Sequence, residues 1–265
     1  MILRSPYPSP LSILGVPVDE LDSYEAAVDR VARTIADGRK AFWVAINPQK
    51  IHRALREPEL LAAINAAEVR ICDGVGVSLA SRILYGRPIK RCTGCDLFFH
   101  LISASASRGW RVFLLGGSAE ANKQAAAKLV EKHPGLQIVG RQDGFFENSQ
   151  AAIEQINRAK PDLLFVAMGS PKQELWIARH RRAIEAPFCL GVGGSFDVAS
   201  GLVARAPRLF RRVGLEFLYQ LITQPRRWRR QIVYFPFGFA VLCEKFRHKR
   251  AYDCRSASSK ADQVE

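Results

Sequence analysis

Short runs of apolar residues alternate with longer amphipathic segments over most of this chain. Apolar runs such as Ala41–Ile46, Val69–Cys72 and Leu163–Ala167 have the length of buried strands. Between such runs, apolar residues recur three and four positions apart, which is the spacing of a helix with one buried face. This alternation predicts an α/β fold with a mostly parallel sheet that helices cover on both faces.

Further strands are predicted at 111–115, 137–140 and 188–192, with a short edge strand or hairpin at 13–18. Helices are predicted at 23–36, between 48 and 66, at 75–84, 96–107, 119–132 and 150–158, and from about residue 171 onward. Asp22 or Ser23 is placed to cap the first of these helices, and Asp96 to cap the helix at 96–107.

Polar or glycine residues follow five of the predicted strands: Asn47, Asp73, Gly116, Gln173 and Asp197. Parallel strands end at the same edge of a sheet, and open α/β sheets bind their ligands along that edge. The sequence therefore predicts a binding site there. Neighbouring glycines and one loop aromatic are candidates for the same site: Gly117, Gly193, Gly194 and Phe145.

Asp73 follows a buried run and precedes Gly74, where the absence of a side chain lets another molecule approach the backbone. Two interpretations stay open, because Asp73 fits both a site carboxylate and the N-cap of the helix that follows. Asn47 has a similar ambiguity, since Asn before Pro48 forms turns as readily as it binds a ligand hydroxyl.

The positive charge of the chain is concentrated near its end. The 265 residues include 39 Lys and Arg against 25 Asp and Glu, a formal net charge of +14. Twelve of the basic residues and only two acidic ones lie between residues 204 and 250. Such a block predicts an anionic partner, which can be a phosphate, a nucleic acid or an acidic membrane surface.

We divide the chain into an α/β domain at 1–204, a basic and aromatic appendage at 205–250, and a polar tail at 251–265 that we expect to be disordered. In the appendage, arginines alternate with Trp, Tyr and Phe, which is typical of a segment that lies on a bilayer surface. The alternative is a solvated basic helix packed on the core. The apolar run at 232–243 is shorter than the ~18–20 residues of a spanning helix.

Six cysteines occur in a chain whose N-terminus lacks a signal-peptide pattern, so we expect reduced thiols in the cytoplasm. Cys92 and Cys95 have the spacing of a redox or zinc pair. Neither a second pair nor a nearby His completes a four-ligand site. We interpret the pair as incidental, and we expect no metal ion and no cofactor.

Several motifs occur in a characteristic order: Asn47-Pro48, CDGVGV at 72–77, the segment 91–97, FLLGG at 113–117, DGFF at 143–146, GSPKQELWI at 169–177, GVGGSFDVASG at 191–201, RAP at 205–207 and GLEFLYQL at 214–221. From about residue 13 to residue 230, the chain resembles the WecG/TagA/CpsF family of bacterial glycosyltransferases. Two positions depart from many members: Ala45 replaces a Thr, and Gln220 replaces an Arg after Tyr219. These departures leave the donor and the acceptor open.

The resemblance implies a Rossmann-like, inverting transferase that moves a sugar from a UDP-sugar to a polyprenyl-diphosphate-linked saccharide at the cytoplasmic membrane face. The sugar would be of the N-acetylmannosamine type, its uronic acid or glucose, used in cell-surface or exopolysaccharide synthesis. The implied site residues are Asp73 as the base, Arg91, Gln173 and Asn47 at the reacting centre, Asp197 on the nucleotide side, and Arg227 and Arg230 at the diphosphate.

The chemistry of the leaving group favours arginines over a metal ion. UDP leaves with developing negative charge, which fixed cations can stabilise. No Asp-x-Asp pair stands at a strand end, whereas Arg91, Arg227 and Arg230 are available.

Three other functions are alternatives to sugar transfer. A nicotinamide oxidoreductase needs GxGxxG after its first strand, and the glycines of this chain lie elsewhere. A nucleic-acid partner is not expected, since the basic residues flank an apolar aromatic stretch without a known binding motif. The remaining alternative is a non-catalytic protein that binds a membrane surface or an anionic polymer.

Overall fold

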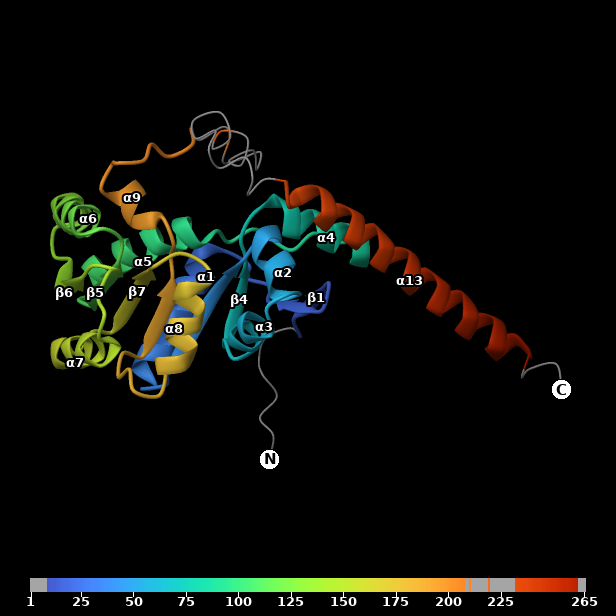
Figure 1. The fold of residues 1–265 in the computed structure, drawn as a ribbon, viewed down its shortest axis with the longest axis horizontal. Helices are drawn as coiled ribbons and strands as arrows, with labels where there is room; N and C mark the ends of the chain where they lie inside the picture. Colours follow the sequence, from blue (N-terminus) through green and yellow to red (C-terminus); the bar gives the residue numbers. More distant parts are fainter. Residues whose placement is uncertain (1–8, 208–209, 211–218, 220–231, 262–265) are drawn as a thin grey trace.

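The computed structural model describes residues 9–207, 210, 219 and 232–261 (Figure 1). Its centre is a six-stranded sheet with the order β4-β3-β8-β7-β5-β6. All neighbouring strands in this sheet are parallel. The strands are β3 (Ala41–Ile46), β4 (Val69–Cys72), β5 (Arg111–Gly116), β6 (Gln137–Gln142), β7 (Leu163–Ala167) and β8 (Phe188–Gly191). The parallel sheet predicted from the apolar runs is confirmed.

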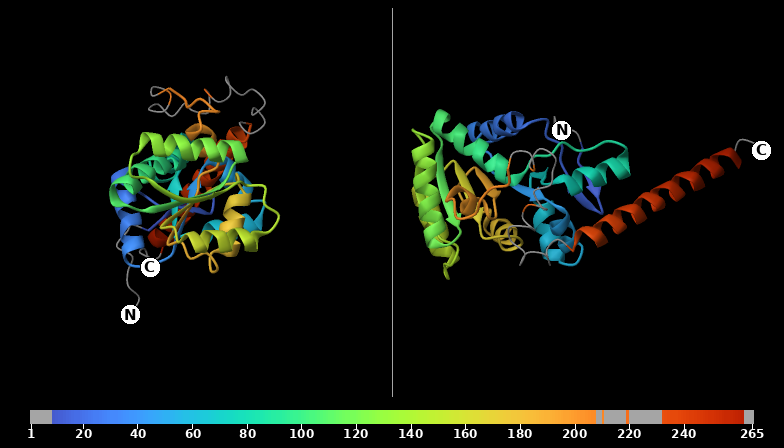
Figure 2. Two further views of the ribbon diagram at one scale, coloured as in Figure 1. Left: turned by 90° about the vertical axis from the view of Figure 1, so that its left-hand side faces the viewer. Right: turned by 90° about the horizontal axis from the view of Figure 1, so that it is seen from above.

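Helices cover both faces of the sheet, as the left view of Figure 2 shows. One face packs against α2 (Pro48–Ala54), α3 (Pro58–Asn65), α4 (Val75–Tyr85), α7 (Ser149–Ala159) and α8 (Lys172–His180). The other packs against α1 (Tyr24–Ala36), α5 (Gly94–Arg108), α6 (Ala119–Lys132) and α9 (Ser195–Ala199). Successive strand residues serve opposite cores, with Phe42 and Val44 in the first and Trp43 in the second. This three-layer arrangement confirms the Rossmann-like class.

The helix caps explain two differences from the predicted boundaries. Thr93, rather than Asp96, caps α5, since its Oγ1 accepts the Asp96 N–H at 3.1 Å. The helix therefore includes Gly94, whose low helix propensity matters little in the first turn. Asp73 does not cap α4, because Gly74 occupies the N-cap position without a side-chain bond. The Asp73 carboxylate is thus available for other contacts.

The N-terminal strands β1 (Leu11–Ile13) and β2 (Val16–Val18) form the predicted hairpin. Leu14 and Gly15 both have positive φ, as a two-residue hairpin turn requires. The hairpin leads to Asp19, whose N–H donates to Arg70 O at 2.8 Å and whose carboxylate pairs with the Arg70 side chain at 2.8 Å. These contacts cover the outer edge of β4.

The C-terminal helix α13 (Tyr234–Ala261) runs past α4 and extends beyond the body of the protein (Figure 1; Figure 2, right). Phe237 and Val241 are buried in the core cluster that includes α4. The helix reaches residue 261, where a disordered tail was predicted from residue 251. The domain boundary at residue 204 stays a prediction.

Among the described residues, no helix combines the length and the apolar composition needed to cross a membrane.

Candidate active site

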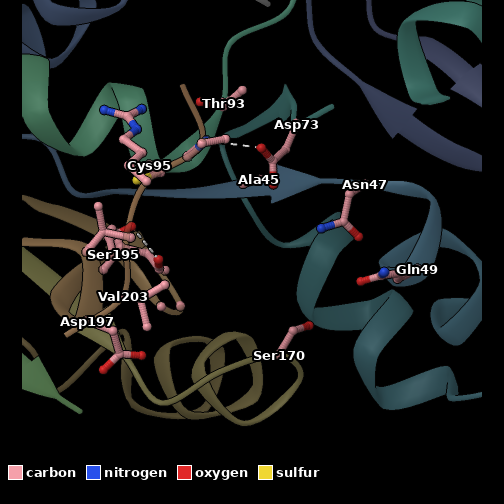
Figure 3. A pocket seen from close by; sticks show the side chains of 18 of the residues that line it. Ala45, Asn47, Gln49, Asp73, Thr93, Cys95, Ser170, Ser195, Asp197 and Val203 are labelled. Atoms are coloured by element: carbon pink, nitrogen blue, oxygen red, sulfur yellow. Dashed lines mark hydrogen bonds between the residues drawn. The ribbon is translucent and has the colours of Figure 1, made fainter. Parts of the chain in front are cut away.

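A cavity of about 350 Å³ lies at the carboxyl edge of the sheet. Six of the predicted site residues line it: Asn47, Asp73, Gln173, Gly193, Gly194 and Asp197. In Figure 3, Asp73, Asn47 and Gln49 lie along one side of this space, and Ser195 and Asp197 lie along the other. The structure thus brings together residues from four separate segments, as the sheet edge predicted.

Asp73 is held by the backbone on both sides of its side chain. Its N–H donates at 2.8 Å to the carbonyl oxygen of Ile46, which is the last residue of β3. Its Oδ1 accepts the Gly94 N–H at the start of α5 at 3.3 Å, the bond drawn in Figure 3. The position of Asp73 is therefore set by contacts with the ends of two other segments, β3 and the start of α5.

The surroundings of Asp73 shift the pKa of its carboxyl group. Burial raises the pKa of Asp73 above its ordinary value. The charge of Lys50, the Gly94 N–H, the Asn47 side chain and the charge of Arg91 act in the opposite direction and do not cancel it. A carboxylate with a raised pKa binds a proton more strongly, which suits a general base.

Asn47 has the structural role that the sequence left open, and its binding of a ligand hydroxyl stays a prediction. Its Oδ1 accepts the Lys50 N–H at 2.9 Å and caps α2. The same side chain lines the cavity and acts to lower the pKa of Asp73. The cap fixes the side chain, so its amide is held in the cavity wall.

Gln173 belongs to a buried network that the sequence did not reveal. Its Oε1 accepts the Gly193 N–H at 3.0 Å, and its Nε2 donates to Glu174 Oε1 at 2.8 Å. Glu174 pairs with Lys50 at 2.7 Å, and both side chains are buried. The sequence contained one hint of this network. Lys50 stands next to the apolar Ile51, and both lie on the buried face of α2.

Gly193, Gly194 and Asp197 form another part of the cavity wall. Gly193 has a φ of 52°, in the left-handed region that glycine adopts most easily. Gly194 precedes α9, and Asp197 lies in the first turn of that helix. The Gly193 N–H is already bonded to Gln173, and the Asp197 carboxylate lies in this part of the wall.

Gly116 and Gly117 lie at the same sheet edge but outside the cavity wall. A Cβ on Gly116 would lie 2.5 Å from the backbone of Ala167, and Gly117 N–H donates to Ala167 O at 2.8 Å. Glycine is required here because β5 and β7 approach closely. Phe145 also lies outside the wall, with 81% of its surface exposed.

The predicted arginines divide into two groups. Arg91 does not line the cavity, but its charge acts on Asp73 and lowers the pKa of that carboxyl group. Arg227 and Arg230 lie outside the described residues. Arg205, which sequence reasoning did not select, lines the cavity, pairs with Asp96 and stacks 5.2 Å from the centre of the Phe99 ring.

Tyr234 connects α13 to the site. Its ring lies 3.3 Å from the position of a Cβ on Gly76, and Pro48 fills the rest of that space. Burial, with a smaller effect of the Asp73 charge, raises the pKa of Tyr234 to about 12. The phenol is therefore neutral at ordinary pH. Gly76 in the CDGVGV motif was the only signal for this contact in the sequence.

Cys92 and Cys95 are free thiols. Burial raises the pKa of both, so neither is ionised at neutral pH. In the part of the chain that the structure describes, no three His, Cys, Asp or Glu side chains gather as a metal site would require.

Comparison with known proteins places this geometry in a family. The glycosyl transferase WecG/TagA/CpsF family model matches residues 11–251. An N-acetylglucosaminyldiphosphoundecaprenol N-acetyl-beta-D-mannosaminyltransferase of Bacillus spizizenii is 34% identical over 89% of this chain and 92% of its own length. A protein of the same name from Bacillus subtilis is 33% identical over 78% of this chain and 81% of its own length. The chain therefore belongs to the WecG/TagA/CpsF family and is a glycosyltransferase.

Proposed function

We propose that this glycosyltransferase moves a sugar from a UDP-sugar to a polyprenyl-diphosphate-linked saccharide, with inversion and with Asp73 as the general base. The carrying observation is the placement of Asp73 in the cavity, held by the Gly94 N–H at 3.3 Å. The names of the two relatives support the acceptor class, because both describe sugar transfer to a saccharide on diphosphoundecaprenol.

In this reaction the acceptor hydroxyl oxygen forms a bond to C1 of the donor sugar. The bond between C1 and the phosphate oxygen breaks, and UDP leaves with the electron pair. Asp73 accepts the hydroxyl proton and later releases it to solvent. Burial, which raises the pKa of Asp73, supports this role by making the carboxylate a stronger base.

The other cavity residues suit the two substrates. We assign Gly193, Gly194 and Asp197 to the donor nucleotide, because all three line the cavity next to Gln173. Gln173 keeps one Nε2 hydrogen for the donor or the acceptor. Arg91, Arg227 and Arg230 are our candidates for stabilising the charge on UDP.

Gly116, Gly117 and Phe145 remain candidates for an outer part of the donor site. The Phe145 loop is tied to the glycine turn, because Gly144 N–H donates to Gly117 O at 2.9 Å. The exposed Phe145 ring at this edge can contact a donor that extends beyond the cavity.

The acceptor lipid lies in a membrane, and α13 carries an exposed apolar surface that can bind to one. Four apolar side chains on this helix are exposed: Phe235, Phe239, Leu242 and Phe246. Their spacing of four, three and four residues places them on one stripe of the helix. With the nearby basic residues, this stripe supports peripheral binding to the inner face of the membrane.

A donor panel tests the proposal. Purified protein is mixed in detergent with N-acetylglucosamine-diphosphate-polyprenol and one labelled UDP-sugar: N-acetylmannosamine, its uronic acid or glucose. We expect one donor to give a labelled lipid product, with UDP release that depends on the acceptor. The same reactions are run with a glucose-diphosphate lipid acceptor. Absence of lipid product from every pair would contradict the proposal.

A further inference from the structure

Lys50 and Glu174 form an ion pair beneath the cavity. Lys50 Nζ lies 2.7 Å from Glu174 Oε1, and the side chains are only 4% and 1% exposed. Removing two charges from water is unfavourable, and hydrophobic residues of similar volume often stabilise a core at least as well. The contacts of each partner indicate a purpose other than folding.

Lys50 is anchored next to the strand position that holds the base. Its Nζ donates to Ala45 O at 2.7 Å, and Asp73 N–H donates to the adjacent carbonyl, Ile46 O, at 2.8 Å. Lys50 and Asp73 both line the cavity. Burial raises the pKa of Asp73, and Lys50 is the largest of the opposing effects. Lys50 therefore favours the ionised carboxylate, which is the form that accepts a proton.

Glu174 fixes the amide of Gln173. Glu174 Oε1 accepts from Gln173 Nε2 at 2.8 Å, while Gln173 Oε1 accepts the Gly193 N–H at 3.0 Å. An acceptor on one side and a donor on the other allow only one orientation of the amide. Glycine at position 191 provides the space, since a Cβ there would lie 2.6 Å from Gln173 Nε2.

We propose that Lys50 and Glu174 are positioning residues for sugar transfer: Lys50 keeps the Asp73 carboxylate ready to accept a proton, and Glu174 keeps the Gln173 amide turned toward Gly193. The inference rests on the proposed role of Asp73 as the base. An ion pair that only joins α2 to α8 would instead change folding, and it would alter the transfer rate by the same factor at every pH.

The pH profile of kcat/KM separates these possibilities. A general base gives the profile an acid limb, below which the base is protonated. Lys50→Met removes the charge that favours ionised Asp73, so the limb moves to higher pH. We expect the loss of rate relative to wild type to be about tenfold larger below the limb than above it.

Lys40→Met is the matched control for this variant. Lys40 precedes β3 and donates to Arg182 O at 3.2 Å and to Ile184 O at 2.6 Å, at the opposite edge of the sheet from the cavity. The same substitution there removes a lysine that also bonds to backbone carbonyls. We expect the acid limb of Lys40→Met to match that of wild type.

A double variant keeps the test valid if Lys50→Met fails to fold with Glu174 buried and unpaired. Lys50→Met/Glu174→Gln removes both charges, which avoids the isolated buried ion. We expect this protein to fold and to keep the shifted limb. Glu174→Gln alone retains the Lys50 charge, so its limb should not move to higher pH. If Glu174 acts through the Gln173 amide, the rate loss of Glu174→Gln should disappear in a Gln173→Ala background, whereas a purely structural loss would be the same in both backgrounds.

A folded double variant with the wild-type limb and the wild-type rate would overturn the positioning role. The proposed function fails by a different result, which is an Asp73→Asn protein that transfers sugar at the wild-type rate. The two failures are therefore distinguishable in the same assay.

Discussion

The charge of Lys50 acts on two carboxylates whose surroundings differ. Asp73 follows β4 and lies half-buried at the cavity. Glu174 lies in α8, is fully buried and pairs directly with Lys50. Burial raises the pKa of both groups, and for Asp73 this effect prevails. For Glu174, the charge and hydrogen bond of Lys50, with bonds from Gln173 and Ser170, lower the pKa below its ordinary value.

This difference shows how one sheet edge can supply a base and a permanently charged support from the same class of residue. Direct pairing keeps Glu174 ionised, so it can orient its neighbours over a wide pH range. Asp73 has no such direct partner among the ion pairs of the described residues, so it can gain and lose a proton. Opposed environments of this kind are how enzymes assign different roles to similar groups.

The largest expected effect comes from removing the base. Asp73→Asn keeps the shape of the side chain but cannot accept the acceptor proton, so we expect transfer to fall about 10²- to 10⁴-fold. The measurement is acceptor-dependent UDP release at saturating substrates. Asp37→Asn, which changes a surface carboxylate paired with Arg39, is the control. A loss of less than tenfold in Asp73→Asn would exclude it as the base.

Removing one partner of the ion pair should lower stability as well as activity, because it leaves the other charge buried and uncompensated. Glu174→Leu leaves Lys50 buried without its partner, and we expect the free energy of unfolding to fall by about 3–5 kcal/mol. Adding Lys50→Met should restore most of that stability, because no charge then remains buried, but it should not restore the transfer rate. Urea unfolding measures the stability of the single and the double variant. Equal destabilisation of the single and double variants would show that packing, rather than charge, explains the loss.

The pH dependence of stability should have opposite signs at the two carboxylates. Because the folded-state pKa of Asp73 is raised, its favourable contribution exists at low pH and is lost as the pH rises through that pKa. Asp73→Asn cannot ionise, so its Tm should exceed that of wild type increasingly as the pH rises toward neutral. Each 1 kcal/mol corresponds to about 2–4 °C. A Tm difference independent of pH would contradict this environment for Asp73.

For Glu174 the lowered pKa gives the reverse dependence. Its contribution is present above the unfolded pKa and is lost as the pH falls through the folded pKa. Glu174→Gln has no carboxyl group to protonate at this position. Its free energy of unfolding should therefore fall less than that of wild type as the pH decreases through this range.

The smallest expected effect concerns the Tyr234 phenol, whose pKa is raised in part by the charge of Asp73. Tyr234→Phe removes the hydroxyl and keeps the ring that lies near Gly76. The loss of one partly buried polar group predicts a fall in transfer rate of about two- to tenfold. Tyr85→Phe is the control, because the Tyr85 hydroxyl donates to Ser12 O at 2.6 Å on the hairpin side of α4. Equal rates for the two variants would remove Tyr234 from the site.

The sheet edge was predictable because each strand is a short apolar run that ends at a polar or glycine residue. Asn47, Asp73 and Gln173 follow separate runs, and parallel pairing brings their ends together. The Lys50–Glu174 pair was not predictable in this way, since its partners are 124 residues apart and each lies on an ordinary amphipathic helix.

The two glycine turns show where the pattern was insufficient. Gly116-Gly117 and Gly193-Gly194 both follow buried strands, and both were predicted to lie at the binding site. Only the second pair lines the cavity, while Gly116 allows close contact with Ala167. The difference depends on which strands are neighbours, and the apolar runs alone do not specify strand order.

The most direct test of the contrast between the carboxylates is a ¹³C NMR titration of the Asp and Glu carboxyl groups, assigned with Asp73→Asn and Glu174→Gln. We predict that Asp73 titrates above the ordinary range of an Asp side chain and Glu174 below that of a Glu. If Asp73 titrates at or below its ordinary value, burial does not make it a stronger base, and the division of roles between the two carboxylates is wrong.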